Sequence, residues 1–166
     1  MTFYIGRFKG LETMEFEAEI ITPMFLGGSD TKKAEFRVPS IKGALRFWWR
    51  AANAHLSMDK LKERESEIFG DAGSQFGKSK VQIKLIQTIE YNGKIKANPV
   101  PHKKATFSFP CLMPGEIFVV KIIGNKTVFD LFRLFSVLSG LGKRSRRGFG
   151  SFLINKENGI PCNKLN

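Results

Sequence analysis

Four cations crowd into one short segment near the end of the chain, GLGKRSRRGFGSF. Lys143, Arg144, Arg146 and Arg147 lie within five residues, Phe149 follows shortly after, and glycines stand at positions 140, 142, 148 and 150. Glycine allows a backbone to approach a ligand closely, and lysine and arginine neutralise phosphates without reading base sequence. The segment therefore predicts a phosphate-binding loop, with a solvated basic loop as the alternative.

Cations also recur at intervals of four residues in the segment PSIKGALRFWWRAANA. At 100° per residue, Lys42, Arg46 and Arg50 share one face of a helix. Trp49 lies at the border of this face, whereas Trp48 falls on the apolar face. A cationic stripe edged by an aromatic side chain suits a phosphate backbone with a base stacked beside it. The alternative is an amphipathic helix with solvated cations and with both tryptophans partly in the core.

Signals for catalysis are weaker. His55 and His102 are the only two histidines. A metal-independent ribonuclease could use either one as an acid or base, with Lys103 or Lys104 stabilising the phosphorane. Each histidine stands alone, which favours a structural or solvent-exposed role. No HExxH, paired-carboxylate or P-loop spacing occurs, so the sequence predicts no metal ion and no cofactor.

The composition limits the classes of protein that remain. The chain has 166 residues, 27 Lys and Arg against 15 Asp and Glu, a net charge of +12 and 42% hydrophobic residues, which predicts one folded domain. Cys111 and Cys162 match no disulfide framework or zinc spacing, so we expect a reducing, cytoplasmic environment. No signal peptide or membrane span is apparent. The charge favours nucleic acid as the partner, with an anionic membrane surface second.

Hydrophobic periodicity predicts the elements that position these residues. Strands are expected at 14–21, 80–90, 116–124 and 148–155, and helices at 40–56, 61–69 and 127–141. Ser40 and Thr127 are the expected N-caps. Asn92-Gly93 predicts a tight hairpin, and the prolines of 97–115 predict a long irregular loop.

The main elements follow the order β-α-β-β-α-β, the α+β, ferredoxin-like (RRM-like) pattern. This order predicts an antiparallel sheet with the helices on one face and an extra hairpin after the second strand. We expect a single domain over residues 1–166, with its core at about 14–155. The helix at 128–138 is apolar over most of its circumference, which predicts cover by the sheet and by either the loop 97–115 or a partner.

Several of these segments together resemble the RAMP superfamily of CRISPR-associated proteins. They are ITPMFLGGSD, KKAEFRVPSIKGALRFWWRAANA, EIFGDAGSQFG and GLGKRSRRGFGSF, of which PSIKGALRFWWRA is the most specific part. More narrowly, the chain is similar over residues 14–155 to the family members that form the first RAMP subunit of the type III-B (Cmr) effector complex. Those members usually carry two ferredoxin-like halves, and this chain resembles the N-terminal one.

The resemblance implies a non-catalytic RNA-binding subunit of a ribonucleoprotein in antiviral defence. It would be non-catalytic because the family assigns target cleavage to a different subunit. Its partners would be CRISPR guide RNA, target RNA and other RAMP subunits. The RNA-binding residues that it implies are Lys42, Arg46, Trp49, Arg50, Lys143, Arg144, Arg146, Arg147 and Phe149, with Gly27, Gly28 and Ser29 in a loop that faces the helix.

Two other functions remain open. A guide-processing endoribonuclease of the same superfamily shares this fold and glycine-rich loop, and it would need His55 or His102 near a bound phosphate. A protein-interaction module would use the basic loop to bind an acidic partner. The RNA-binding subunit is favoured because the helix motif is specific to the family, whereas neither histidine lies in a family motif.

Overall fold

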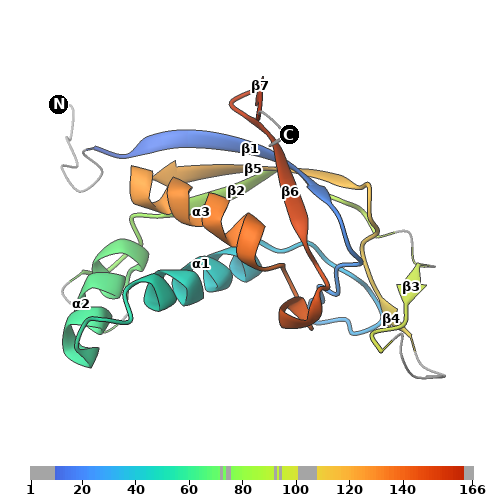
Figure 1. Cartoon of the computed structure of the whole chain (residues 1–166), viewed down its shortest axis with the longest axis horizontal. Coiled ribbons are helices and arrows are strands. Elements are labelled where there is room, and N and C mark those ends of the chain that lie inside the picture. Colours follow the sequence, from blue (N-terminus) through green and yellow to red (C-terminus); the bar gives the residue numbers. More distant parts are fainter. Residues whose placement is uncertain are drawn as a thin grey trace.

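The computed structural model of the chain is built around one antiparallel sheet (Figure 1). It describes residues 10–71, 73, 76–91, 93, 95–100 and 108–162. The strands of the sheet are β1 (Glu12–Ile20), β2 (Gln82–Gln87), β5 (Ile117–Gly124), β6 (Phe152–Glu157) and β7 (Ile160–Pro161), in the order β2-β5-β1-β6-β7. Two short strands, β3 (Lys96–Ala97) and β4 (Phe109–Pro110), pair with each other apart from this sheet.

Two long helices cover one face of the sheet (Figure 1). α1 (Val38–Ala52) packs against α3 (Lys126–Leu138) and β2, and α3 packs against β5 and β6. α2 (Met58–Phe69) follows α1 and packs against it, and a 3₁₀ turn, Ser145–Arg147, lies between α3 and β6. The strand order and the shared helical face confirm the predicted α+β, ferredoxin-like fold.

Alternation along β1 builds the core. Phe16, Ala18 and Ile20 are fully buried beneath the helices, whereas the residues between them are not. The Phe16 ring centroid lies 4.7 Å from that of Phe132 in α3, and the Phe132 centroid lies 5.7 Å from that of Phe152 in β6. Aromatic pairs at such separations contribute stability beyond their buried area. This cluster fixes α3 against the sheet and thereby fixes the point at which the basic segment starts.

The opposite face of the sheet carries acid along its central strand. Glu15, Glu17 and Glu19 alternate with the core residues of β1. Glu15 pairs with Lys121 of β5 at 3.5 Å, and Glu17 pairs with Lys156 of β6 at 2.9 Å. An RRM stacks RNA bases on aromatic side chains of the equivalent open face. Here the outward residues of β1 are carboxylates, two of them paired with lysines, rather than aromatic rings, so an RNA-binding surface is better sought on the helical side or among the loops.

The first helix begins and ends earlier than its sequence suggests. Arg37, not Ser40, is the N-cap residue, because Pro39 fits the first turn of a helix, where its missing N–H costs no hydrogen bond. The helix ends at Ala52, where the side-chain amide of Asn53 donates to a carbonyl of the last turn at 2.8 Å. Side chains that compete for backbone groups in this way terminate helices.

The start of the last helix is also displaced. The side chain of Asn125, rather than that of Thr127, caps α3 by accepting a hydrogen bond from the amide of Val128 at 3.1 Å. The cap follows directly on the last residue of β5, so the chain turns from strand to helix without a connecting loop. α3 then ends at Leu138, before the predicted boundary.

The residues after β2 depart furthest from expectation. β2 pairs with β5 and β3 pairs with β4, whereas the hairpin expected at Asn92-Gly93 lies outside the described residues, because Asn92 is not among them. β3 has only two residues before a segment that contains Pro99, which cannot donate to a strand ladder. β3 and β4 still supply an extra two-stranded arm after the second strand. β7, which pairs with β6 across a turn at Asn158, was not predicted.

One side of α3 remains apolar and open. Leu134, Val137 and Leu138 are 41%, 78% and 55% exposed. The expected cover by the loop 97–115 falls partly outside the described residues, since 101–107 are not among them. This surface borders the cavity described below between α3 and α1.

Candidate nucleic-acid interface

The basic loop, residues 140–151, is docked onto the segment that leaves β1. The amide of Lys143 donates to the carbonyl of Phe25 at 2.9 Å, and the amide of Gly150 donates to the carbonyl of Pro23 at 3.0 Å. At the base of the loop, the amide of Leu141 donates to the carbonyl of Gly150 at 2.9 Å. The loop is therefore held at both ends and projects its cations from a fixed base.

Three of the four glycines in the loop serve this docking. A Cβ atom at Gly140, Gly142 or Gly150 would lie within 2.5 Å of a backbone carbonyl oxygen of the chain itself. Gly148, with φ +82° and open space around it, is the one glycine of the four whose surroundings could admit a ligand. The expectation that the glycines bring backbone close to a ligand is therefore wrong for the other three, because they bring two parts of the backbone close to each other.

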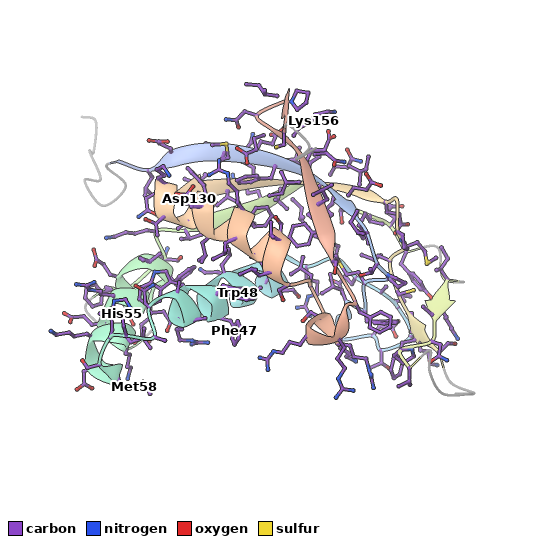
Figure 2. All side chains as sticks on the ribbon, in the orientation of Figure 1. Phe47, Trp48, His55, Met58, Asp130 and Lys156 are labelled. Atoms are coloured by element: carbon purple, nitrogen blue, oxygen red, sulfur yellow. The ribbon has the colours of Figure 1, made fainter. Side chains whose placement is uncertain are left out.

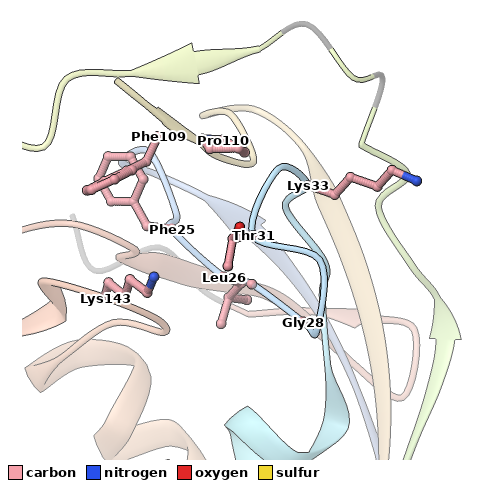
Figure 3. Close-up of a pocket in the computed structure, with 9 residues that line it drawn as sticks. Phe25, Leu26, Gly28, Thr31, Lys33, Phe109, Pro110 and Lys143 are labelled. Atoms are coloured by element: carbon pink, nitrogen blue, oxygen red, sulfur yellow. The ribbon is translucent and has the colours of Figure 1, made fainter. Parts of the chain in front are cut away.

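Lys143 borders a small hollow on one side of the loop (Figure 3). Its ammonium lies 5.7 Å from the ring centroid of Phe109 in β4, which is a cation–π distance. The hollow, of about 110 Å³, is lined by Gly27 and Gly28 of the loop before α1 as well as by Phe109 and Lys143. The structure thus brings the predicted Gly27-Gly28 pair to Lys143, whereas Ser29 is exposed and does not line the hollow.

Arg146 reaches to the other side of the loop. Its guanidinium carbon lies 5.0 Å from the ring centroid of Phe47 in α1. Phe47 projects from α1 on the side away from the sheet (Figure 2). A larger cavity, of about 510 Å³, lies here between α1, α3 and the loop. The loop is thus a basic ridge between two hollows, each of which places a cation over an aromatic ring.

The cations of the loop are not paired with any carboxylate of the described residues. Within the described ranges, no carboxylate lies at ion-pair distance from Lys143, Arg144, Arg146 or Arg147. Arg146 and Arg147 are exposed, and the amide of Arg147 donates to the carbonyl of Arg144 at 2.8 Å across the 3₁₀ turn. Arg144 holds a left-handed conformation, with φ 62°. The turn therefore concentrates positive charge that the described protein does not neutralise.

The cations of α1 differ in this respect. The Arg46 Nε donates to Glu65 of α2 at 2.6 Å, and the Arg50 Nη1 donates to the same carboxylate at 3.3 Å. The Glu65 side chain is only 8% exposed, whereas those of Arg46 and Arg50 are 39% and 46% exposed. Glu65 thus neutralises part of the predicted stripe and leaves the outer edges of both guanidinium groups open to solvent.

Lys42 completes the stripe, and no carboxylate of the described residues lies at ion-pair distance from it. Burial, followed by the repulsion of nearby Arg46, lowers the pKa of its ammonium group. A charged group that is half-buried beside a like charge is stabilised by a bound anion. A phosphate at Lys42 would therefore raise this pKa again.

Two of the aromatic residues assigned to RNA pack into the protein. Trp49 is 4% exposed and continues the buried stripe of Ile41 and Leu45, whereas Trp48 is only partly buried, which reverses the expected roles of the two tryptophans. The stripe at intervals of four residues sets the phase of α1 against the core. Phe149 is partly buried with its ring centroid 5.1 Å from that of Phe25, so it anchors the loop.

The Glu65 contact predicts the direction of two changes, one in stability and one in RNA affinity. We expect Glu65→Gln to lower the free energy of unfolding by about 1–2 kcal/mol, since it removes a buried charge from two half-exposed arginines. We also expect it to raise single-stranded RNA affinity about twofold, because both guanidinium groups lose a competing anion. Denaturant titration and filter binding measure the two effects.

Glu67→Gln is the matched control for this variant. Glu67 lies on the same helix and pairs with Lys80 at 3.2 Å, but both side chains are exposed, so the expected loss is below about 0.5 kcal/mol. Equal stability losses in the two variants would contradict the role given to Glu65.

The candidate catalytic residues gain no support from their positions. His55 is exposed in the turn after α1, and His102 lies outside the described residues. In the parts of the chain that are described, no three His, Cys, Asp or Glu side chains lie close enough to hold a metal ion together. Likewise, no helix in those parts is both long and apolar enough to cross a bilayer.

Sequence reasoning missed Phe47 and Glu65. The signal for Phe47 was available in its spacing, which puts a large aromatic residue on the half of α1 away from Ile41 and Leu45. In the structure its side chain is 41% exposed. No comparable signal marks Glu65, because the segment KERESE alternates acids and bases that look equally solvated in sequence. Its burial depends on how α2 packs on α1.

These features belong to a ferredoxin-like domain with a basic, glycine-framed loop after its last helix. The family model of the RAMP superfamily matches residues 17–153, which run from β1 to β6 and include the loop. The chain therefore belongs to the RAMP superfamily.

Within that superfamily, the chain is homologous to Cmr1. It is 40% identical to the CRISPR system Cmr subunit Cmr1-2 of Pyrococcus furiosus, over 84% of this chain and 93% of that one. It is 33% identical to Cmr1-1 of the same organism, over 84% of this chain and 47% of that one. The chain thus spans almost all of Cmr1-2 and about half of Cmr1-1, and the resemblance drawn from the sequence motifs is confirmed.

Solved structures agree with this assignment. The apo crystal structure of Cmr1 from Pyrococcus furiosus matches with a TM-score of 0.62 at 28% identity, over 89% of this chain and 50% of that one. A chain of the type III-B Cmr-beta assembly bound to cognate target RNA matches with a TM-score of 0.59 at 17% identity, over 95% and 63%. At that identity the second match supports the fold alone.

Proposed function

We propose that this chain is a non-catalytic RNA-binding subunit of a type III-B CRISPR (Cmr) ribonucleoprotein in antiviral defence. It contacts the backbone of guide or target RNA through the basic loop and the exposed edge of α1. In this proposal, residues 1–166 act as one RAMP ferredoxin-like domain that assembles with other RAMP subunits.

The single observation that carries this proposal is the basic loop itself. Four cations project from a turn held by backbone hydrogen bonds, and no described carboxylate lies at ion-pair distance from them. Unneutralised charge on a fixed loop suits a polyanion, whose phosphates replace the water around the cations. The open sheet face supports the same side of the molecule, because its central strand presents carboxylates paired with lysines rather than aromatic rings on which bases could stack.

The α1 residues contribute less charge than the sequence suggested. Lys42 and the outer edges of Arg46 and Arg50 extend the surface, but Glu65 already accepts hydrogen bonds from both arginines. Arg146 over Phe47 connects the loop to α1, since Phe47 directly follows Arg46 in the chain. We leave Trp49 out of the proposed surface because it is buried.

Binding of single-stranded RNA at several salt concentrations tests the proposal. Neutralisation of about four to six phosphates gives a log–log slope of affinity against salt of about −3 to −4. We expect that slope with r(U)15 and r(A)15 alike, and weaker binding of a duplex of the same length. A slope near zero, or no binding at 50 mM salt, would overturn the RNA-binding function.

The same preparations decide whether the chain cleaves RNA. Incubation with CRISPR repeat RNA in EDTA is expected to leave the RNA intact. Site-specific cleavage that disappears in His55→Ala or His102→Ala would replace the proposed function with that of a metal-independent guide-processing endoribonuclease.

A further inference from the structure

We propose that the cavity between α1, α3 and the basic loop binds one unstacked nucleobase of a single-stranded RNA. This inference rests on the proposed RNA-binding function and deepens it, since it says where a base is held in addition to the phosphates. The cavity measures about 510 Å³, within the range of small-ligand sites. Its lining comes from Ala44, Phe47 and Trp48 of α1, Phe135 and Leu138 of α3, and Ser139, Gly140, Ser145 and Arg146 beyond it.

The aromatic side chains of the cavity are arranged for stacking. The ring centroids of Phe47 and Trp48 lie 5.7 Å apart, with their planes at 88°. The two rings are thus perpendicular. A flat base can therefore stack on the face of one ring while the other ring contacts it edge-on. Phe47 is 41% exposed despite the guanidinium group of Arg146 beside it. Sequence-tolerant readers of single-stranded RNA stack unpaired bases on such aromatic rings and on arginine planes.

The polar groups of the cavity also fit a base. Ser139 and Ser145 line it, and each hydroxyl can donate as well as accept a hydrogen bond. Hydroxyls that do both can meet the edge of any base, which fits a subunit that must tolerate many guide and target sequences. Among the described residues that line the cavity, none is acidic.

The charge around the cavity selects RNA over an apolar protein segment. Arg146 belongs to the lining, and Arg144 and Arg147 stand directly beside it on the same turn. A base in the cavity would bring its flanking phosphates to these cations. Leu138 and the neighbouring Val137 make the α3 rim of the cavity apolar. The experiments must therefore distinguish a bound base from a protein helix docked on this rim.

Phe47→Ala separates these possibilities, since this side chain carries no charge and is exposed. We expect single-stranded RNA affinity to fall about tenfold at every salt concentration, with an unchanged salt slope, because stacking releases no counterions. Phe47→Trp restores stacking and is expected to restore affinity. Met58→Ala, an equally exposed apolar truncation at the start of α2 and outside the cavity lining, is the matched control and is expected to change nothing.

Tryptophan fluorescence gives an independent measurement. Trp48 and Trp49 are the only two tryptophans, so Trp49→Phe leaves Trp48 as the sole reporter. We expect r(U)15 to quench its emission, and inorganic pyrophosphate, which has no base, to leave it unchanged.

The outcomes are distinguishable. If the wild type does not bind RNA, the proposed function fails. If it binds but Phe47→Ala binds equally well, the base site alone is overturned, and the apolar rim is left for a protein partner. A lower salt slope in Phe47→Ala also overturns it, because the ring would then act only by holding Arg146 in place.

Discussion

Replacement of Arg144, Arg146 and Arg147 together by alanine is expected to weaken single-stranded RNA binding about 100-fold at 0.1 M salt. Each phosphate contact contributes about 0.7 to the salt slope for a single strand, so three lost contacts reduce the slope by about 2. Between 1 M and 0.1 M salt, a tenfold change, a slope lower by about 2 corresponds to an affinity about 100-fold weaker at the lower salt concentration. Titration at three or more salt concentrations measures both quantities in one experiment.

A control of equal charge is available on α2. Lys60, Lys62 and Arg64 are exposed on that helix, which lies at the opposite end of α1 from the basic loop (Figure 1). Their joint replacement by alanine also removes three positive charges. It is expected to change RNA affinity less than about threefold, through long-range electrostatics alone. If the two triple variants behave alike, net charge rather than the docked loop binds the RNA.

A second large effect is expected from Gly150→Ala. This glycine has φ +69°, and a Cβ atom there would overlap with the carbonyl group of Leu141 at the base of the loop. The left-handed backbone and the overlap together are expected to cost about 3–5 kcal/mol of unfolding free energy. For a chain of this length, that loss lowers the midpoint of thermal unfolding by roughly 6–20 °C.

Gly148→Ala shows how much of that loss comes from conformation alone. Gly148 has a similar φ of +82°, but nothing lies within 4 Å of its Cβ position. We expect a loss of only about 1–2 kcal/mol in this variant. Calorimetry of both variants decides the matter, because equal losses would mean that the crossing of residues 140–141 with 149–150 does not hold the loop.

The fold could be predicted from the sequence where one local pattern fixed the outcome. Hydrophobic periodicity located the strands β1 and β5, and the order of strands and helices left the ferredoxin-like sheet as the simplest arrangement. The pairing of β3 with β4 could not be predicted, because turn signals are local, whereas the pairing of β2 depends on the longer apolar strand that β5 offers.

The site was predictable in composition but not in geometry. The density of cations in residues 143–147 was visible in the sequence. The sequence did not show that the loop carries more unneutralised charge than the α1 stripe. That difference depends on Glu65, which reaches Arg46 and Arg50 only after α2 has packed on α1. The exchange of roles between Trp48 and Trp49 likewise follows from the rotation of α1 on the core, which adjacent residues cannot reveal.

Arg144 brings stability and charge into conflict at one position. Its left-handed backbone, with φ 62°, suits glycine and strains arginine by about 1 kcal/mol. A directed-evolution campaign that selects for heat tolerance alone would favour Arg144→Gly and would discard the proposed phosphate contact in the same step. Thermostable forms of this domain therefore have to be screened for RNA affinity alongside their melting temperature, because at this residue the two traits move in opposite directions.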